Sequence, residues 1–108
     1  MSYGQDDVVV AADPFGHTPR RPYLVVSNDA RPFQGEDYLV AGITTTERED
    51  GIALVDESDA GGLDRESFVS PWTVLTIRND HVSKRVAVAS TRVVEEAARS
   101  IARYVEPA

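Results

Sequence analysis

The ten residues 20–29, RRPYLVVSND, decide how we interpret this chain. Pro22 lacks a backbone N–H and therefore suits the start of a β-strand. The apolar run that follows predicts a strand over residues 22–27, and Ser-Asn-Asp predicts the turn after it. Two adjacent arginines, Arg20 and Arg21, precede this strand although the 108-residue chain has a formal net charge of −7. Their position at a strand entrance needs a chemical explanation.

Short apolar runs separated by polar turns predict further β-strands on both sides of this one. The expected strands, in chain order, cover residues 7–12, 22–27, 37–44, 52–55, 67–77 and 84–89. Pro71 interrupts the fifth strand and predicts a bulge or an edge position there. Residues 28–36 are expected to form a turn, and the acidic, Gly-Gly-containing residues 56–66 a long exposed connection.

The hydrophobic period changes near the C-terminus. From Ser90 onward the apolar residues recur at helical spacing: Val93, Val94, Ala97, Ala98, Ile101, Ala102 and Val105. This stripe predicts an amphipathic helix that closes one side of the core, with Ser90 or Thr91 as its N-cap. The expected fold is therefore mainly β with a C-terminal α-helix: a small barrel with the helix packed on it, in one domain over residues 1–108.

Composition limits the class of protein. The chain has no cysteine, which excludes disulfides and thiolate metal sites. Its apolar runs reach only four or five residues, too few to cross a bilayer, and the N-terminal MSYGQDD lacks the features of a signal peptide. We therefore expect a soluble, cytoplasmic protein with no membrane partner.

The charge pattern is acidic and poor in lysine. There are 18 acidic residues against 11 basic ones, and Lys84 is the only lysine. This balance indicates either a generic acidic surface or adaptation to a cytosol of molar salt, and we favour the halophilic interpretation. At such salt the Debye length is only about 3 Å, so repulsion from nucleic acid is largely screened. An RNA contact would then have to be local.

The order of the motifs resembles that of the PemK/MazF toxin family. The stretch 20–29 is followed by VAGITTT (40–46), by GLDRESFV (62–69) and by a capped helix. The resemblance implies an SH3-like β-barrel (PemK/MazF/CcdB-like) that is usually a homodimer. It also implies an endoribonuclease that needs no metal or other cofactor, cleaves single-stranded RNA and is inhibited by a cognate antitoxin protein. A gyrase-directed relative is disfavoured by the Arg-Pro and Ala-x-Ile-Thr motifs.

The same resemblance assigns roles to individual residues. Arg21 matches the arginine that acts at the scissile phosphate, and Thr44 the threonine that hydrogen-bonds the same phosphate. A fixed guanidinium and a hydroxyl donor suit the negative charge that develops when the RNA 2′-OH attacks phosphorus. Arg20, Thr45 and Arg78 are expected to bind RNA. The alternative roles are a surface ion pair for Arg21 and an ordinary strand position for Thr44.

Two departures from the family pattern leave a second hypothesis open. The Gly16-His17 loop is shortened and lacks the family's glutamate, although His17 can still serve as a general acid or base. Leu75 occupies the position where a basic residue is expected, and Arg78 that of an aspartate. Either Arg20 or Arg78 compensates, or the RNA path has moved, or cleavage is lost. In the last case the chain is a binding module for RNA or a protein. A basic groove across a dimer interface, in which Arg20, Arg21 and Arg78 converge, would favour the nuclease, and a flat acidic face there would favour the binding module.

The aromatic residues are expected to pack in the core or in a dimer interface rather than to stack on bases. These residues are Tyr23, Phe33, Tyr38, Phe68 and Trp72.

Overall fold

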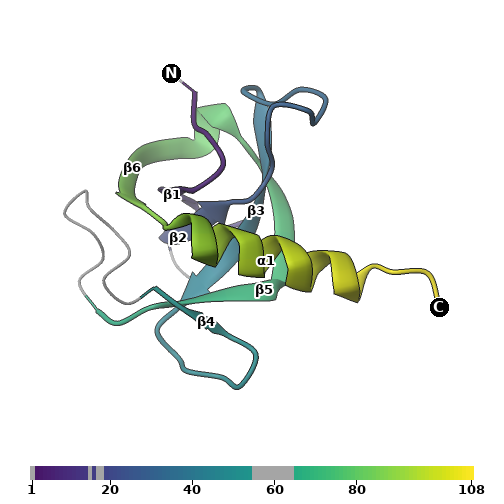
Figure 1. The fold of residues 1–108 in the computed structure, drawn as a ribbon. Helices are drawn as coiled ribbons and strands as arrows, with labels where there is room; N and C mark the ends of the chain where they lie inside the picture. The colour runs from purple at the N-terminus through teal and green to yellow at the C-terminus, as the bar shows by residue number, and fades with distance from the viewer. Residues whose placement is uncertain (1, 15, 17–18, 55–64) are drawn as a thin grey trace.

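A computed structural model describes residues 2–14, 16, 19–54 and 65–108. Within these residues six strands form one antiparallel sheet with the order β4-β5-β3-β2-β1-β6, and a helix lies across one face of it (Figure 1). The elements are β1 (Asp7–Ala12), β2 (Arg20–Val25), β3 (Asp37–Thr44), β4 (Ile52–Ala53), β5 (Phe68–Arg78), the 3₁₀ turn η1 (Asn79–His81), β6 (Val82–Val88) and α1 (Thr91–Tyr104). No helix in these segments is long and apolar enough to span a membrane.

The predicted class, mainly β with a C-terminal helix, is confirmed. The predicted barrel is not, because β4 and β6 are the two edges of an open sheet and do not pair with each other in the described residues. The strand predicted at 52–55 is shorter than expected, and the last strand begins two residues earlier than residue 84. Most of the connection predicted at 56–66 lies outside the described residues.

Side chains from the two faces of the sheet form two separate apolar clusters, as strand alternation requires. We call the first the helix-side cluster; it joins Val8, Leu24, Ala41, Ile43 and Val69 to Val93, Val94 and Ala97 of α1. We call the second the tyrosine cluster, which contains Val9, Ala11, Tyr23, Val25, Tyr38, Val40 and Ile77 on the opposite face. Both faces of β1, β2 and β3 are therefore buried, which fixes the register of these central strands.

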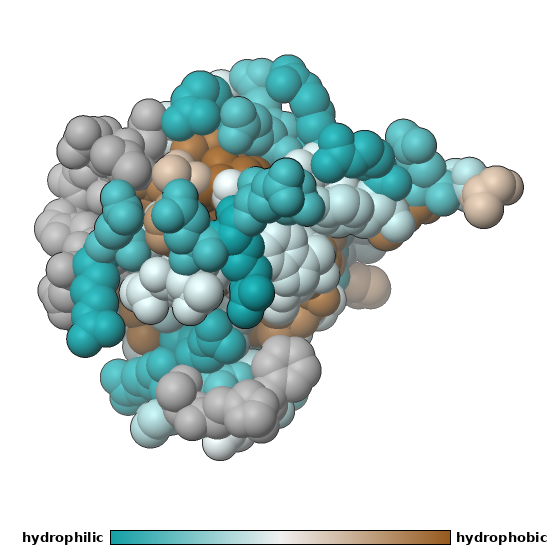
Figure 2. Space-filling model, turned by 90° about the horizontal axis from the view of Figure 1, so that it is seen from below, coloured by the Kyte–Doolittle hydropathy of each residue, from teal (hydrophilic) through white to brown (hydrophobic). Residues whose placement is uncertain are grey.

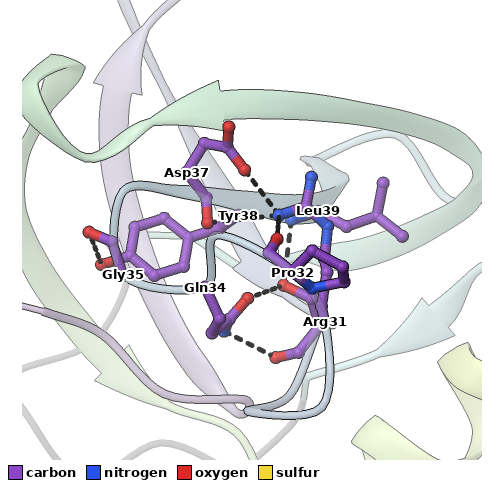
Figure 3. Close-up of polar contacts among 8 residues, drawn as sticks. Arg31, Pro32, Gln34, Gly35, Asp37, Tyr38 and Leu39 are labelled. Carbon is purple, nitrogen blue, oxygen red and sulfur yellow. Dashed lines mark hydrogen bonds and ion pairs between the residues drawn. The ribbon is translucent and has the colours of Figure 1, made fainter.

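The loop between β2 and β3 also fixes their register (Figure 3). The Ser27 hydroxyl donates to Gln34 Oε1 at 2.7 Å and accepts from the Leu39 N–H at 3.0 Å, while Arg31 forms an ion pair with Asp37. A one-residue slip of β3 would break all of these contacts. The loop thereby determines which residues meet at the far end of the β2–β3 pair.

The bulge predicted at Pro71 is present. Ala41 pairs with Val74 and Gly42 with Ser70, so residues 71–73 of β5 have no partner on β3. The backbone at Gly42 lies so close to the Thr73 side chain that a Cβ at Gly42 would be 3.2 Å from Thr73 Cγ2. The first part of β5 thus remains paired with the end of β3, beside Thr44.

Helix α1 begins at the predicted cap, where the Ser90 hydroxyl accepts the Val93 N–H at 3.2 Å. Its buried side is narrower than the predicted stripe, since only Val93, Val94 and Ala97 are buried. Val105 is 73% exposed. The reason is visible in Figure 1, where the C-terminal end of α1 extends beyond the strands.

The aromatic residues divide between core and surface. Tyr23, Tyr38 and Phe68 are buried as predicted, whereas Phe33 and Trp72 are 70% and 43% exposed. Phe33 lies in the β2–β3 loop, where its backbone adopts a left-handed φ of 66°. Phe33 and Trp72 are therefore not core residues of this chain, and their packing in a dimer interface stays a prediction.

Candidate active site

A hollow of about 270 Å³ opens where the start of β2 lies beside the end of β3. Seven residues line it: Arg20, Arg21, Pro22, Ile43, Thr44, Thr45 and Ser67. Tyr23 pairs with Gly42 in the β2–β3 ladder, and continuing this register by two residues brings Arg21 beside Thr44. Four of the residues predicted from sequence thus meet at one place: Arg20, Arg21, Thr44 and Thr45.

The side chain of Arg21 is half-buried and has spare hydrogen-bonding capacity. Its Nη2 donates to the carbonyl oxygen of Ile43 at 3.3 Å, a long hydrogen bond. No carboxylate among the described residues forms an ion pair with it, so Arg21 is not held as a surface salt bridge in this part of the chain. Most of the five N–H donors of a guanidinium therefore remain available to an anion in the hollow.

Thr44 presents a hydroxyl to the same hollow. Its Oγ1 accepts the N–H of Thr46 at 3.1 Å, which fixes the position of the oxygen at the end of β3. The hydroxyl hydrogen remains free to donate. Arg21 and Thr44 together can thus offer a charged and a neutral donor to a single phosphate group.

Two of the predicted site residues are not part of this hollow. Arg78 pairs with Asp37 at the opposite end of the β3–β5 ladder from Thr44, and its guanidinium lies 2.9 Å from the Asp80 carboxylate. Within this chain Arg20, Arg21 and Arg78 therefore do not converge. His17 lies outside the described residues.

Leu75 also lies away from the hollow. It is opposite Val40 in the β3–β5 ladder and packs, partly buried, against the tyrosine cluster. The position thus serves packing, and the leucine does not leave the hollow without a cation.

Sequence reasoning missed two residues near the hollow. Ser67 is buried beside it, with its hydroxyl donating to the Arg65 carbonyl oxygen at 2.9 Å. The serine of the 62–69 motif was the available signal. Tyr23, two residues after Arg21, has a buried hydroxyl with no hydrogen-bond partner among the described residues. Burial raises the pKa of Tyr23, the charge of Asp13 raises it further, and the charge of Arg21 opposes them.

A second hollow, of about 360 Å³, contains none of the predicted residues. It is lined by Ser2, Tyr3, Asp7, Ser83, Lys84 and Arg85, and Arg85 lies 3.4 Å from the Asp7 carboxylate. Across the described segments, no three His, Cys, Asp or Glu side chains gather closely enough to hold a metal ion.

Comparison with known proteins gives matches over almost the whole chain. Residues 5–105 match the family model described as "PemK-like, MazF-like toxin of type II toxin-antitoxin system". The search of curated proteins found no significant match.

Solved structures with the same fold cover nearly the full length. An endoribonuclease in complex with its cognate antitoxin, from a mycobacterial species, is 18% identical, with a TM-score of 0.75 over 99% of this chain and 100% of that chain. MazF (Form-I) from Deinococcus radiodurans is 16% identical, with a TM-score of 0.77 over 97% of each chain. The Mycobacterium tuberculosis toxin MazF-mt6 is 20% identical, with a TM-score of 0.70 over 90% of this chain and 93% of that chain. At these identities the structural likeness establishes the fold alone.

Proposed function

Because this chain belongs to the PemK-like, MazF-like toxin family of type II toxin–antitoxin systems, we propose that it is an endoribonuclease for single-stranded RNA, inhibited by a cognate antitoxin. The observation that carries the proposal is the hollow in which Arg21 and Thr44 present unused donors side by side. Proteins with the same fold include endoribonucleases, one of them bound to its antitoxin.

The proposed reaction uses a nucleophile that belongs to the RNA. The 2′-oxygen attacks the adjacent phosphorus, the bond from phosphorus to the 5′-oxygen breaks, and the products carry a 2′,3′-cyclic phosphate and a 5′-hydroxyl. Negative charge on the non-bridging oxygens increases in the transition state, where the guanidinium of Arg21 and the hydroxyl of Thr44 stabilise it. The 2′-OH loses a proton and the leaving oxygen gains one, and His17 is the candidate for one of these transfers. The step needs no metal to generate the nucleophile.

Arg20 and Thr45 are proposed to bind the RNA next to the scissile phosphate, since both line the hollow. Arg78 can reach the same RNA only at a distance from it, because β3 runs between the two places. Homodimer formation could bring the Arg78 of a second copy closer, and we propose a homodimer on that ground.

We further propose that the protein works in the cytoplasm, at high salt. Its surface is acidic and contains a single lysine. Figure 2 shows hydrophilic side chains over much of one face, with smaller apolar areas between them. Because salt screens the repulsion between such a surface and RNA, the local contacts in the hollow can act without a basic groove.

The second candidate is a binding module that has lost cleavage. The substitution of Leu75 for a basic residue favours it. The position of Leu75 on the tyrosine cluster, away from the hollow, argues against it, because the substitution leaves Arg21 and Thr44 with their donors available.

The test is to incubate the purified protein with a long single-stranded RNA in molar KCl and EDTA. We expect discrete fragments with 5′-hydroxyl ends from the wild type, and none from Arg21→Ala or Thr44→Val. Arg99→Ala is the charge-matched control, since Arg99 lies on α1 and pairs there with Glu95. Intact RNA at every salt concentration, with folded wild type, would reject the nuclease. Retained RNA binding in that case would support the binding module.

A further inference from the structure

The buried hydroxyl of Tyr23 has a cost that the folded structure does not offset. Its ring belongs to the tyrosine cluster and the residue is only 2% exposed, yet its oxygen has no hydrogen-bond partner among the described residues. A buried hydroxyl without a partner loses its bonds to water and gains none in return. Phenylalanine would fill the same space without this cost.

Tyr38, in the same cluster, shows how a buried tyrosine is ordinarily accommodated. Its hydroxyl accepts the Tyr3 N–H at 3.0 Å and donates to Asn79 Oδ1 at 2.8 Å. The ring of Tyr3 also packs edge-on against it, with 6.0 Å between ring centroids. The two tyrosines therefore differ in what their hydroxyls do, although both rings contribute to the same apolar packing.

Tyr23 lies two residues along β2 from Arg21, which lines the hollow. Residues two apart on a strand share a face, so Arg21 and Tyr23 lie on the same side of β2. Ala11, which is opposite Arg21 on β1, also belongs to the tyrosine cluster. The charge of Asp13 raises the pKa of Tyr23 and that of Arg21 lowers it, as expected for a hydroxyl on the same side of β2 as Arg21.

We propose that Tyr23 is a positioning residue for Arg21, an inference that rests on the proposed ribonuclease function. When an RNA phosphate enters the hollow, Arg21 exchanges its long bond to the Ile43 carbonyl for contact with the phosphate. The Tyr23 oxygen then accepts one N–H of the guanidinium and holds its plane toward the phosphate.

This role predicts opposite effects on stability and on activity. Tyr23→Phe removes a buried hydroxyl that has no partner in the RNA-free protein, so the variant should be as stable as the wild type or more stable. The same change removes a contact that forms only with phosphate in the hollow. If the hydroxyl had a purely structural role, Tyr23→Phe would lower the stability of the protein and leave the cleavage rate of the folded variant unchanged.

The experiment compares Tyr23→Phe with the matched control Tyr38→Phe in the full chain. We expect an unfolding midpoint in urea that is unchanged or higher for Tyr23→Phe and lower for Tyr38→Phe, which leaves the Tyr3 N–H unpaired. With saturating RNA under single-turnover conditions, Tyr23→Phe should cleave about tenfold more slowly, and Tyr38→Phe at nearly the wild-type rate. Adding Tyr23→Phe to Arg21→Ala should weaken RNA binding no further than Arg21→Ala does alone, because Tyr23 acts through Arg21.

Two outcomes would overturn the inference while cleavage by the wild type stands: a Tyr23→Phe rate within about twofold of wild type, or a lower unfolding midpoint for Tyr23→Phe. If the wild type does not cleave RNA, the proposed function fails and the inference is judged on binding. An oligonucleotide with a 2′-deoxy group at each position is then the probe. About tenfold weaker binding by Tyr23→Phe supports the inference, and equal binding, or none by either protein, rejects it.

Discussion

At the scale of single residues, variants of Leu75 test whether the leucine at this position, where the family pattern has a basic residue, affects packing or catalysis. Its partly buried side chain packs on the tyrosine cluster, so Leu75→Ala should lower the free energy of unfolding by about 1–2 kcal/mol. Cleavage by the folded variant should not change. Val74→Ala is the control: Val74 is exposed on the other face, and its loss should change stability by less than about 0.5 kcal/mol. Urea unfolding measures both. Faster cleavage by Leu75→Arg than by wild type would show instead that the leucine had weakened catalysis.

Asp6 links stability to pH. Burial raises the pKa of this carboxyl, the neighbouring charge of Asp7 raises it further, and Arg85 opposes them. A raised folded pKa means that ionised Asp6 destabilises the fold: the penalty is complete above the folded pKa and is lost as the pH falls below the unfolded value of about 3.9. Asp6→Asn should therefore be more stable than wild type near neutral pH. Its advantage should shrink toward about pH 4.

Urea midpoints across this pH range test the Asp6 prediction. The control is Asp29→Asn, which removes one exposed negative charge from the turn after β2. A stability difference for Asp6→Asn that is the same at every pH, or that grows in acid, would contradict the prediction.

At the scale of elements, the sequence predicted the features that depend on residues close together in the chain. Short apolar runs between polar turns predicted the strands, Pro71 predicted a bulge or an edge, and Ser90 or Thr91 predicted the helix start. Periodicity could not give the pairing order of the strands, because pairing depends on contacts far apart in the chain. For this reason the sequence identified Arg21 and Thr44 by motif, but it could not show that Arg78 lies at the other end of β5. Tyr23 was predicted only to pack in the core or in a dimer interface, since an unpaired hydroxyl has no sequence signature.

Our prediction for the elements concerns the contribution of the N-cap of α1 to stability. Ser90→Ala should cost about 1 kcal/mol of unfolding free energy, because it removes the acceptor of the Val93 N–H at the helix start. The loss should appear in the whole protein, since Val93 and Val94 join α1 to the helix-side cluster. Thr91→Ala, an exposed change one residue later, should stay within about 0.5 kcal/mol of wild type. Equal losses for both variants, measured by urea unfolding, would contradict the role of Ser90 as the cap.

At the scale of the whole molecule, net charge should make stability depend on salt. A formal charge of −7 on 108 residues destabilises the compact state by repulsion, and salt screens this repulsion. The exposed ion pairs, such as Arg78–Asp80 and Arg99–Glu95, contribute only about 0–1 kcal/mol each, so their screening costs less. The thermal midpoint should therefore rise between about 0.1 M and about 2 M KCl, over which the Debye length falls from about 10 Å to below about 3 Å.

A charge variant distinguishes repulsion from a general effect of KCl on burial. Glu49→Gln with Asp50→Asn, both in the exposed loop after β3, changes the formal charge from −7 to −5 by removing two negative charges. If repulsion limits stability, this variant should have the higher midpoint in about 0.1 M KCl and should gain less from added salt. A parallel rise for both proteins would assign the effect to stronger hydrophobic burial in salt. A falling midpoint for the wild type would mean that its ion pairs outweigh its repulsion, and that the acidic surface is not an adaptation to salt.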